Sequence, residues 1–469
     1  MMDYSSFLSH EKVLLVAPAG YGKTFTLAQC LKHTCGKSLL LTHTHAGVAS
    51  IRKKLKDELV DSEKYNVETI SSFAQKYVQA FYTGTDIPKQ EDSKKYHPFV
   101  LEKAIEILSI PAIQCVIQAT YSGVFVDEYQ DCTSGHHALV MSLSSNLPLR
   151  IFGDNLQGIF NFNGDLVDFA TELAEFFRFP PLATPHRWNL AGNAALGASL
   201  DCIRNKLEKG EDIDLNDYSA TIEYVDGADG YFDPRTAYAK KLNEIRRDKS
   251  LLVIHPNSIR IEPRLKFSSR FKEISTIESI DDKSFYALAK VADKFDDSKK
   301  YPILKKIAQQ FYAKTELDKW FGDSDFKNKR DDIAKRHVVE LRRCLEGSGN
   351  LRALAEALEK VSQLPSFSCT RKELLRSLNK AIDIALSKNI SVYDGMKEQR
   401  NNVRRAGRRV EGRHIGTTLL TKGLEFDTVV VLDAHKFECP KHLYVALTRC
   451  RKRLVVIAKS SVLTPYPSP

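Results

Sequence analysis

The sequence lacks three features that would each have assigned it to a class of protein. It has nine cysteines but no C-x-x-C pair, which argues against a disulfide framework and against a zinc or iron–sulfur cluster. No apolar run approaches the ~20 residues that a membrane-spanning helix needs. The first residues, MMDYSSFLSHEK, lack the basic segment and apolar core of a secretory signal. We therefore expect a soluble, cytoplasmic protein with reduced thiols and no membrane partner.

Length and charge bound the function only loosely. With 469 residues, the chain can form several hydrophobic cores and should contain two or more domains. Its 69 Lys and Arg residues against 59 Asp and Glu residues give a formal net charge of +10, which is consistent with an anionic polymer as partner. A charge of this size is also common in proteins that bind no nucleic acid.

Short apolar runs followed by charged turns indicate two α/β regions. Between Val13 and about Arg187 the runs include SLLLTHT, GVFVDEYQD and LRIFGDN, which are typical of buried parallel strands. The same pattern returns at 250–257 and 428–434. Between about Pro263 and Arg400 the composition favours helices, and Leu351–Leu364 is predicted to be amphipathic. The predicted face of that helix consists of Leu351, Leu354, Ala355, Leu358 and Val361.

The stretch VLLVAPAGYGKTFTLAQCL, which begins at Val13, has the order strand, glycine-containing turn and helix. A phosphate-binding loop needs this order, because backbone N–H groups at a helix N-terminus and one lysine must converge on the phosphates. Lys23 would neutralise β/γ-phosphate charge, and the Thr24 hydroxyl would complete the shell of a Mg²⁺ ion. The alternative is an ordinary strand-to-helix turn. The predicted loop comprises Ala17, Pro18, Ala19, Gly20, Tyr21, Gly22, Lys23 and Thr24.

A second motif, GVFVDEYQD, follows about a hundred residues later. A strand that delivers adjacent carboxylates to its C-terminal edge suits two tasks, with Asp127 holding a hydrated Mg²⁺ and Glu128 polarising the attacking water. Taken alone, the motif fits a solvated acidic turn equally well. Together with the loop it predicts phosphoryl-transfer chemistry, which needs both parts.

Eight segments carry a resemblance to a known family. In order along the chain they are APAGYGKT, LLLTHTHAGVASIRKKL, TISSFA, VFVDEYQD, IFGDNLQGIFNFNG, TPHRW, TKGLEFDTVVV and LYVALTRCRKRL. Their order and approximate spacing resemble the helicase motifs of UvrD/Rep/PcrA-like superfamily 1 proteins. The phosphate loop of that family commonly begins with alanine, as it does here at Ala17.

The resemblance implies roles for further residues around ATP and Mg²⁺. It implies the nucleotide, metal and general-base roles already given to Lys23, Thr24, Asp127 and Glu128. It further implies that Gln157 senses the γ-phosphate or its water, and that Arg187 and Arg449 approach the γ-phosphate. Such planar cations stabilise developing phosphoryl charge. Glu425 is similar to an acid that senses ribose or phosphate in the family.

Contacts with DNA are implied by the same resemblance. Phe162 in IFNFNG matches an aromatic residue on which the family stacks a base, and stacking is tolerant of sequence. The alternative is that Phe160 and Phe162 belong to the hydrophobic core. The other positions that match DNA-contacting sites of the family are Thr42, His43, Thr44, Ser72 and Thr417.

The sequence also departs from the family. No glutamine precedes the loop in the twelve residues before Val13, so the strictness for ATP stays open. His186 stands where the family often has a tyrosine that stacks on adenine, and His43, Leu419 and Asn163 replace other family residues. The arginine-rich segment EQRNNVRRAGRRVEGRH could bind phosphate or a partner, or could form a solvated hinge.

The expected fold is α/β, with two RecA-like P-loop domains that have parallel sheets and each carry a mainly helical insertion. The predicted boundaries are 1–77 and 120–190 for the first domain, 78–119 for its short insertion, 191–262 and 402–469 for the second domain, and 263–401 for its helical insertion. No nuclease domain is expected after Arg449.

Two functions are compatible with these features. The first is an ATP-dependent translocase or helicase that acts on single-stranded or tailed duplex DNA, with 3′ to 5′ movement implied by the resemblance. The second is a DNA-stimulated regulatory ATPase that binds DNA ends and controls a separate nuclease subunit. Its motivation is the short insertions and the similarity in size and layout to the helicase-like subunits of anti-phage systems such as Gabija.

Overall fold

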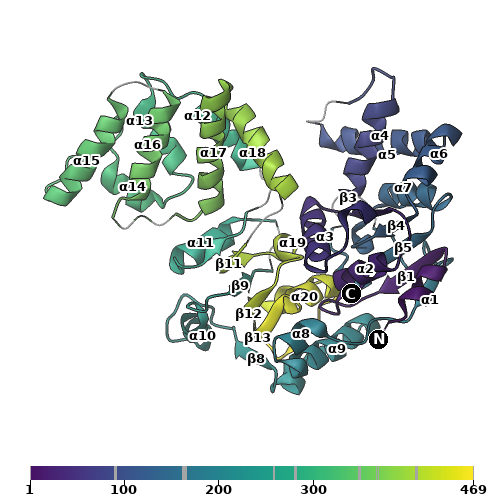
Figure 1. The fold of residues 1–469 in the computed structure, drawn as a ribbon. Coiled ribbons are helices and arrows are strands. Elements are labelled where there is room, and N and C mark those ends of the chain that lie inside the picture. The colour runs from purple at the N-terminus through teal and green to yellow at the C-terminus, as the bar shows by residue number, and fades with distance from the viewer. Residues whose placement is uncertain are drawn as a thin grey trace. The chain divides into compact units, whose positions relative to one another are not determined.

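The computed structural model describes residues 2–88, 92–160, 166–256, 259–278, 283–346, 350–365, 367, 369–406 and 410–467. The chain divides into two compact units, one formed by 1–228 together with 422–469 and the other by 229–421. Figure 1 labels the elements of each unit along the chain.

A parallel six-stranded sheet carries the two nucleotide motifs. Its strands are β1 Lys12–Val16, β2 Ser38–Thr42, β3 Tyr65–Thr69, β4 Gly123–Val126, β5 Leu149–Gly153 and β6 Phe177–Phe179. Their order is β3-β2-β4-β5-β1-β6, and every pairing is parallel. The carboxyl ends of β4, β5 and β1 are therefore neighbours at one edge, where side chains from three separate motifs can meet.

Helices cover both faces of this sheet. They are α1 Tyr4–Ser9, α2 Lys23–Lys32, α3 His45–Asp57, α4 Ile70–Phe81, α5 Ser93–Leu108, α6 Pro111–Thr120 and α7 Ser134–Ser144. One face packs on α1, α2 and α3, and the other on α4 to α7. Leu40 faces the first group and its neighbours Leu39 and Leu41 face the second, which explains why the strands are apolar without interruption.

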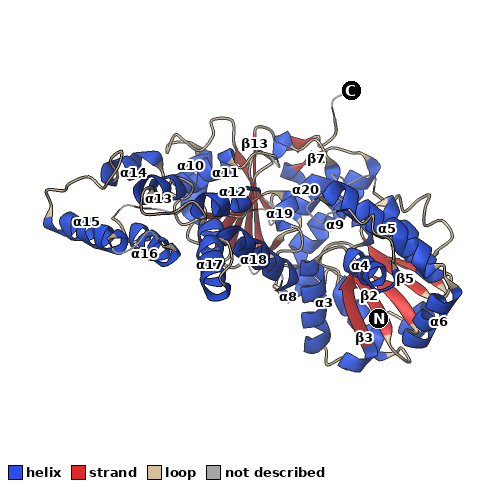
Figure 2. Ribbon diagram, turned by 90° about the horizontal axis from the view of Figure 1, so that it is seen from above, coloured by secondary structure: helices blue, strands red, loops and turns tan. Residues whose placement is uncertain are grey.

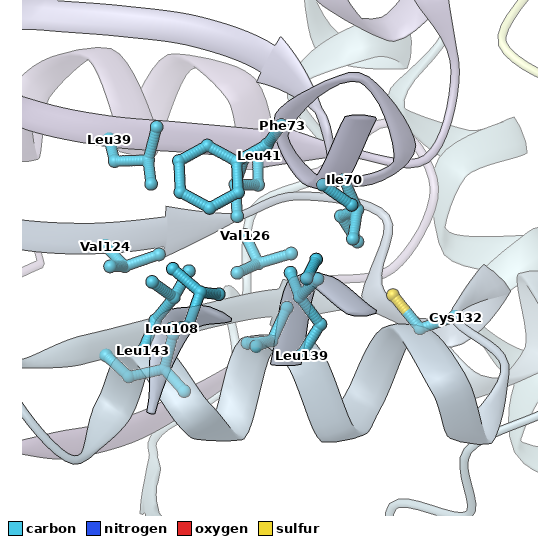
Figure 3. Packing of buried hydrophobic residues seen from close by; sticks show 14 of the residues in the cluster. Leu39, Leu41, Ile70, Phe73, Leu108, Val124, Val126, Cys132, Leu139 and Leu143 are labelled. Atoms are coloured by element: carbon cyan, nitrogen blue, oxygen red, sulfur yellow. The ribbon is translucent and has the colours of Figure 1, made fainter. Parts of the chain in front are cut away.

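Figure 3 shows part of the second core. The labelled residues of strands β2 and β4 are Leu39, Leu41, Val124 and Val126, and those of helices α4, α5 and α7 are Ile70, Phe73, Leu108, Leu139 and Leu143. The insertion predicted at 78–119 contributes to the same core through α5 and α6, for example with Val100 and Ile117. The insertion is helical, as expected, but its inner face is part of the domain core. Its predicted start at 78 lies inside α4, which ends at Phe81.

The second sheet also has six strands, in the order β10-β11-β9-β12-β13-β8. These strands are β8 Ile222–Asp226, β9 Leu251–Ile254, β10 Ser275–Thr276, β11 Arg413–Gly416, β12 Phe426–Val431 and β13 Cys450–Ala458. The pairings of β10 with β11, β11 with β9, β12 with β13 and β13 with β8 are all parallel. Two parallel six-stranded sheets with flanking helices confirm the predicted α/β fold with RecA-like domains.

Several shorter elements complete the α/β part of the chain. The remaining helices of the first unit are α8 His186–Leu190, α9 Ala194–Lys209 and α20 Pro440–Leu447. Strands β7 Ile213–Asp214 and β14 Val462–Leu463 form a small antiparallel pair. In the second unit, α10 Ala237–Ile245, α11 Glu262–Arg270 and α19 Thr418–Thr421 accompany β9, β10 and β11.

The region between β10 and β11 is mostly helical, as predicted. It contains α12 Lys283–Ala292, α13 Lys300–Ala308, α14 Lys314–Trp320, α15 Asp332–Leu345, α16 Leu351–Ser362, α17 Lys372–Lys388 and α18 Val392–Ala406. Figure 2 shows these helices as a bundle, and their apolar faces share one core. In α16 the buried face includes Ala353 and Ala357 with Leu354, Leu358 and Val361, whereas the predicted members Leu351 and Ala355 lie at its margin.

The two compact units do not correspond one to one with the predicted domains, whose boundaries stay a prediction. Among the described residues, no helix combines the length and the apolar character needed to cross a bilayer.

Candidate nucleotide-binding site

The predicted phosphate loop connects β1 to α2 and contains two glycines in the left-handed region. Gly20 has φ 78° and Gly22 has φ 87°, which favours glycine at both positions. A Cβ atom at Gly20 would lie 2.8 Å from the Trp188 ring, and one at Gly22 would lie 3.2 Å from the His186 imidazole. Backbone conformation and close packing by α8 therefore both select glycine here.

Lys23, the first residue of α2, lies against the carboxylates that follow β4. Its Nζ atom is 2.6 Å from Glu128 Oε1 and 3.4 Å from Asp127 Oδ1. Burial by itself would lower the pKa of Lys23, but the two carboxylates outweigh it and raise that pKa above its usual range. The ammonium group is thus fully charged, and the two motifs that the sequence placed a hundred residues apart meet in space.

Glu128, the second residue after β4, adopts an unusual backbone conformation with φ 56°. For a residue with a side chain this conformation is uncommon, and such residues cluster at functional sites. Burial opposes ionisation, but Lys23 and Lys422 hold the pKa of Glu128 well below its usual range. The side chain keeps 32% of its surface exposed, so an ionised carboxylate remains accessible to solvent.

Gln130 orients Glu128 and joins it to the next strand. Its Nε2 atom donates a short hydrogen bond to Glu128 Oε2, and its Oε1 atom accepts one of 2.9 Å from the backbone N–H of Asp154. Asp154 directly follows β5 and is completely buried. The acid that is predicted to activate water is therefore fixed by the neighbouring motif.

A chain of buried polar groups leads from Asp154 back to the phosphate loop. Asp154 Oδ1 accepts a hydrogen bond of 2.7 Å from Arg204 of α9. The same Arg204 nitrogen donates to the Tyr444 hydroxyl of α20 at 3.2 Å, and that hydroxyl accepts from the backbone N–H of Ala19 at 3.3 Å. Asp154 Oδ2 accepts from Gln157 Nε2 at 2.7 Å. The loop and the Gln157 turn thus belong to one hydrogen-bonded network.

The two predicted arginines are connected to this network in different ways. Arg449 is buried and donates from Nη2 to Gln157 Oε1 at 3.3 Å. Burial, followed by the nearby charge of Arg187, lowers the pKa of Arg449 to about 10, so it stays cationic at neutral pH. Arg187 lies 2.8 Å from Glu425 Oε1 and donates to the carbonyl oxygen of Thr448. In this conformation a carbonyl and a carboxylate therefore accept from the two terminal nitrogens of Arg187, and its buried Nε has no hydrogen-bond partner.

Lys422 provides a further connection that was not predicted. Its Nζ atom lies 2.6 and 2.5 Å from the two carboxylate oxygens of Asp131 and also donates to the Gln157 carbonyl. Burial raises the pKa of Asp131 to about 6, while Lys422 acts in the opposite direction. This ion pair joins TKGLEFD to the end of DEYQD.

The residues present fit a nucleotide with a divalent cation. Two glycines in the left-handed region shape the turn before α2, and Lys23 forms ion pairs with the carboxylates of Asp127 and Glu128. Asp127 is buried and Thr24 is half-buried at the first turn of α2. No cluster of three or more His, Cys, Asp or Glu side chains in the described part of the chain could hold a metal. A cation bound by Thr24 and Asp127 would take phosphate oxygens and waters as further ligands.

The positions predicted to contact DNA have diverse environments. Thr42 Oγ1 and His43 Nδ1 at the end of β2, and Thr417 Oγ1 beside α19, are buried atoms without a hydrogen-bond partner. Ser72 Oγ instead accepts a hydrogen bond of 2.7 Å from Thr69 Oγ1. Thr44 caps α3 by accepting from Gly47 N at 3.0 Å.

Phe162 and Asn163 lie outside the described residues. The neighbouring Phe160 is half-buried, with its ring centroid 5.8 Å from that of His43 in a stacked arrangement. Lys422 Nζ lies 5.0 Å from the Phe160 centroid, and His136 contacts His43 at 5.3 Å between ring centroids. One of the two aromatic residues in IFNFNG therefore adjoins His43, whose Nδ1 atom lacks a hydrogen-bond partner.

The arginine-rich segment contains residues with structural contacts. Arg400 is fully buried, 3.9 Å from the centroid of the Phe285 ring. Arg413 donates to the carbonyl oxygens of Arg247 and Asp248. Arg408 and Arg409 lie outside the described residues.

Sequence analysis did not identify Gln130, Arg204, Lys422 or Tyr444 as part of the site. Gln130, Lys422 and Tyr444 lie inside the quoted motifs, but the sequence analysis assigned no role to them. Arg204 lies in a helix between motifs, and nothing in the sequence marked it.

Comparisons with known proteins provide one match by sequence and several by structure. Residues 4–163 match a protein-family model described as an AAA domain, which covers about a third of the chain. No curated protein matches the chain.

Solved helicase structures align at low similarity. The arterivirus nonstructural protein 10 helicase in complex with DNA has 12% identity and a TM-score of 0.36 over 95% of this chain, and the alignment spans 60% of that protein. The Pif1 helicase from Bacteroides, in complex with ADP-AlF3 and single-stranded DNA, has 11% identity and a TM-score of 0.35, covering 99% of this chain and 92% of the other. Similarity at this level does not discriminate between functions.

Proposed function

We propose that the protein is an ATP-dependent translocase or helicase on single-stranded DNA, of the UvrD-like superfamily 1 type. The observation that carries the proposal is the continuous network from Ala19 through Tyr444, Arg204, Asp154 and Gln157 to Arg449. It couples the phosphate loop to a buried arginine through the turn that follows β5. A change at the loop can thereby reach an element of the second sheet.

The chemistry assigned to each side chain follows from this geometry. When bound, ATP with Mg²⁺ would supply the phosphoanhydride bond and the cation that neutralises its charge. Lys23 would exchange its carboxylate partners for phosphate oxygens, which frees Glu128 to accept a proton from water. Thr24 and Asp127 would hold the cation, and Arg449 would stabilise charge that develops during phosphoryl transfer.

Glu425 and Arg187 would respond to the same event. In the present conformation they form an ion pair of 2.8 Å. Arg187 would present both terminal nitrogens to a phosphate by leaving Glu425 and the Thr448 carbonyl. We infer that this exchange accompanies closure of the site, and that the Glu425 carboxylate is then available to a ribose hydroxyl.

The proposed DNA contacts begin at the end of β2. Thr42 Oγ1 and His43 Nδ1 are buried without a partner, and α3 begins two residues after His43. Unpaired polar groups and a helix N-terminus suit a backbone phosphate. Phe160 beside His43 would add an aromatic surface for a base, together with Phe162.

One observation favours the second candidate, a cytoplasmic regulatory ATPase that acts with a separate nuclease in anti-phage defence. The helices of the first insertion, α5 and α6, contribute their apolar faces to the core of the first sheet. Residues that serve this core are not available to contact duplex DNA ahead of a motor. A protein of this design would hydrolyse ATP on DNA and separate strands poorly.

A strand-displacement assay with parallel measurement of phosphate release tests the proposal. The substrates are duplexes with a 3′ tail, a 5′ tail or blunt ends, and Glu128→Gln serves as the inactive control. Displacement of the 3′-tailed duplex alone supports a 3′ to 5′ motor. Displacement of only the 5′-tailed duplex contradicts that polarity. DNA-stimulated hydrolysis without displacement supports the regulatory candidate, and hydrolysis that DNA does not stimulate contradicts both.

A further inference from the structure

A cavity of about 190 Å³ lies at the edge of the first sheet opposite to the phosphate loop. Ser38 begins β2, Ser122 precedes β4, and Arg150 is the second residue of β5. Because the strands are parallel, these residues share the amino-terminal edge, whereas the loop follows the carboxyl end of β1. The nucleotide chemistry proposed above uses none of these residues.

Arg150 lines the cavity and has 6% of its surface exposed. Its Nη2 atom donates to the Leu8 carbonyl at 2.8 Å and its Nη1 atom to the Pro148 carbonyl at 3.4 Å, while its buried Nε atom has no hydrogen-bond partner. Within the described part of the chain, no carboxylate oxygen lies within 4.0 Å of this guanidinium. The acid that acts on it from farther away is Glu11, which is exposed.

The space for this guanidinium depends on Gly123. A Cβ atom at that position would lie 2.7 Å from Arg150 Nη1. The face of the Phe125 ring lies beside the guanidinium, with its centroid 5.4 Å from Cζ. An arginine is thus fitted into the sheet edge between two strands, although burial of a charge that lacks a close counter-charge is costly.

Ser38 provides a second unsatisfied group in the same cavity. The residue is fully buried, and its Oγ atom has no hydrogen-bond partner. Buried polar groups are nearly always paired, so two buried, unpaired atoms on residues that line one cavity indicate a missing partner. The rim adds the hydroxyl groups of Thr34 and Ser122 and the exposed side chains of His33 and Cys35.

We propose that this cavity binds a small oxyanion, with inorganic phosphate as the reference ligand. An oxyanion would supply the nearby negative charge that Arg150 lacks. It would also supply an acceptor for the Ser38 hydroxyl. The hydroxyls of Thr34 and Ser122 donate to the carbonyl oxygens of Leu31 and Lys37, and would turn from these to the anion. The site is independent of the proposed ATPase, because it lies at the other edge of the sheet.

The test uses Cys35 as a local probe. The full-length chain carrying Lys23→Ala, which weakens phosphate binding at the loop, is treated with iodoacetamide in phosphate, in sulfate or in chloride of equal ionic strength. Alkylation of each cysteine is measured by peptide mass spectrometry. Cys115 and Cys202 are exposed and do not line the cavity, so they are internal references. We expect phosphate to slow alkylation of Cys35 several-fold without affecting the references.

Variants assign the protection to the cavity. Arg150→Gln should abolish it, and Ser38→Ala should weaken it with circular dichroism unchanged. Arg178→Gln is the matched control, because Arg178 also donates to a carbonyl but lies on β6, outside the cavity. Protection by sulfate as well supports an oxyanion site. Equal protection in chloride, equal slowing at Cys115, or full protection in folded Arg150→Gln would each overturn the proposal. If Arg150→Gln does not fold, full protection in Ser38→Ala has the same meaning.

Discussion

Buried charges occur in two regions of this chain and have different surroundings. Around the phosphate loop, Lys23 contacts two carboxylates, and Arg449 contacts Gln157 of another motif. In the second unit, Arg371 contacts Glu278 at 2.7 Å and Ser284 at 2.7 Å. Glu278 also accepts from the backbone N–H of Leu374 at 3.2 Å, which fixes β10 to the start of α17.

This difference distinguishes charged side chains that would act in catalysis from those that stabilise the fold. The partners of Lys23 and Arg187 are groups that a phosphate could replace, since both residues are paired with carboxylates that have their own proposed roles. The partners of Arg371 named above, Glu278 and Ser284, lie outside the quoted motifs, and Glu278 joins two elements of the fold. Variants of the first set should therefore change turnover, and variants of the second set should change stability.

The largest expected effect is that of Lys23→Ala. Loss of the ammonium group removes the cation that would neutralise the transferred phosphoryl group, so ATP turnover should fall at least about 100-fold. Phosphate release measures turnover, and circular dichroism should show an unchanged fold. Turnover like that of the parent protein would place Lys23 among the structural charges and remove the basis of the comparison.

Glu128→Gln should lower turnover by about 10² to 10⁴, because the amide keeps the shape of the acid and cannot accept the proton. Nucleotide binding should persist, since the lysine and the loop are intact. Equilibrium binding of a fluorescent ATP analogue, together with single-turnover hydrolysis, separates the two steps. Loss of binding with normal turnover per bound nucleotide would contradict the base assignment.

Arg371→Met should act in the opposite way. Removal of one partner from a buried ion pair lowers the free energy of unfolding by about 3–5 kcal/mol. Turnover of the folded protein, measured well below its melting temperature, should be unchanged. The double variant Arg371→Met with Glu278→Gln should recover part of the stability. Lost turnover at an unchanged melting temperature would show that this pair is functional.

These contrasts also indicate what could be predicted from the sequence. The strands, the loop and the pair Asp127 and Glu128 were predictable because apolar runs and turn residues act over short distances. The exact buried face of a helix was less predictable. In α16, Ala353 and Ala357 are buried although the predicted face did not include them, because the neighbouring helices determine which residues are covered.

The connections between motifs could not be predicted in the same way. Tyr444 and Arg204 are 240 residues apart, and Lys422 and Asp131 are 291 apart. Such pairs depend on the strand order, which no local pattern encodes. The same holds for α5 and α6, whose helical pattern was compatible with a separate insertion and whose burial in the first core follows from topology.

Phe162→Ala extends the comparison to DNA. If Phe162 is a stacking surface, its truncation should weaken binding of single-stranded DNA by about 1–3 kcal/mol and leave basal ATP hydrolysis nearly unchanged. If it belongs to the core, stability should fall by about 3–5 kcal/mol instead. Fluorescence anisotropy at fixed salt and thermal melting separate these outcomes, because phosphate contacts make affinity depend on salt.

The smallest expected effect is the pH dependence that arises from Asp131. Burial raises its pKa to about 6 against the influence of Lys422, so the carboxylate is ionised and paired at neutral pH and loses the pair as pH falls through about 6. Turnover should fall several-fold in this range, because Lys422 no longer joins the TKGLEFD segment to the DEYQD segment. Glu128 does not titrate there, since its pKa lies far lower, and burial holds the pKa values of His43 and His136 near 3 and 4.

The effect of Asp131 protonation on the stability of the fold would not explain such a loss of turnover. The folded-state pKa of Asp131 lies above its ordinary value of 3.8, so between these two values the folded chain binds more protons than the unfolded chain. Acidification through this window therefore increases the contribution of Asp131 to stability. Asp131→Asn should have low turnover at neutral pH and no inflection near 6. An inflection that persists in Asp131→Asn would assign the pH dependence to another group and leave the ion pair with Lys422 a structural contact.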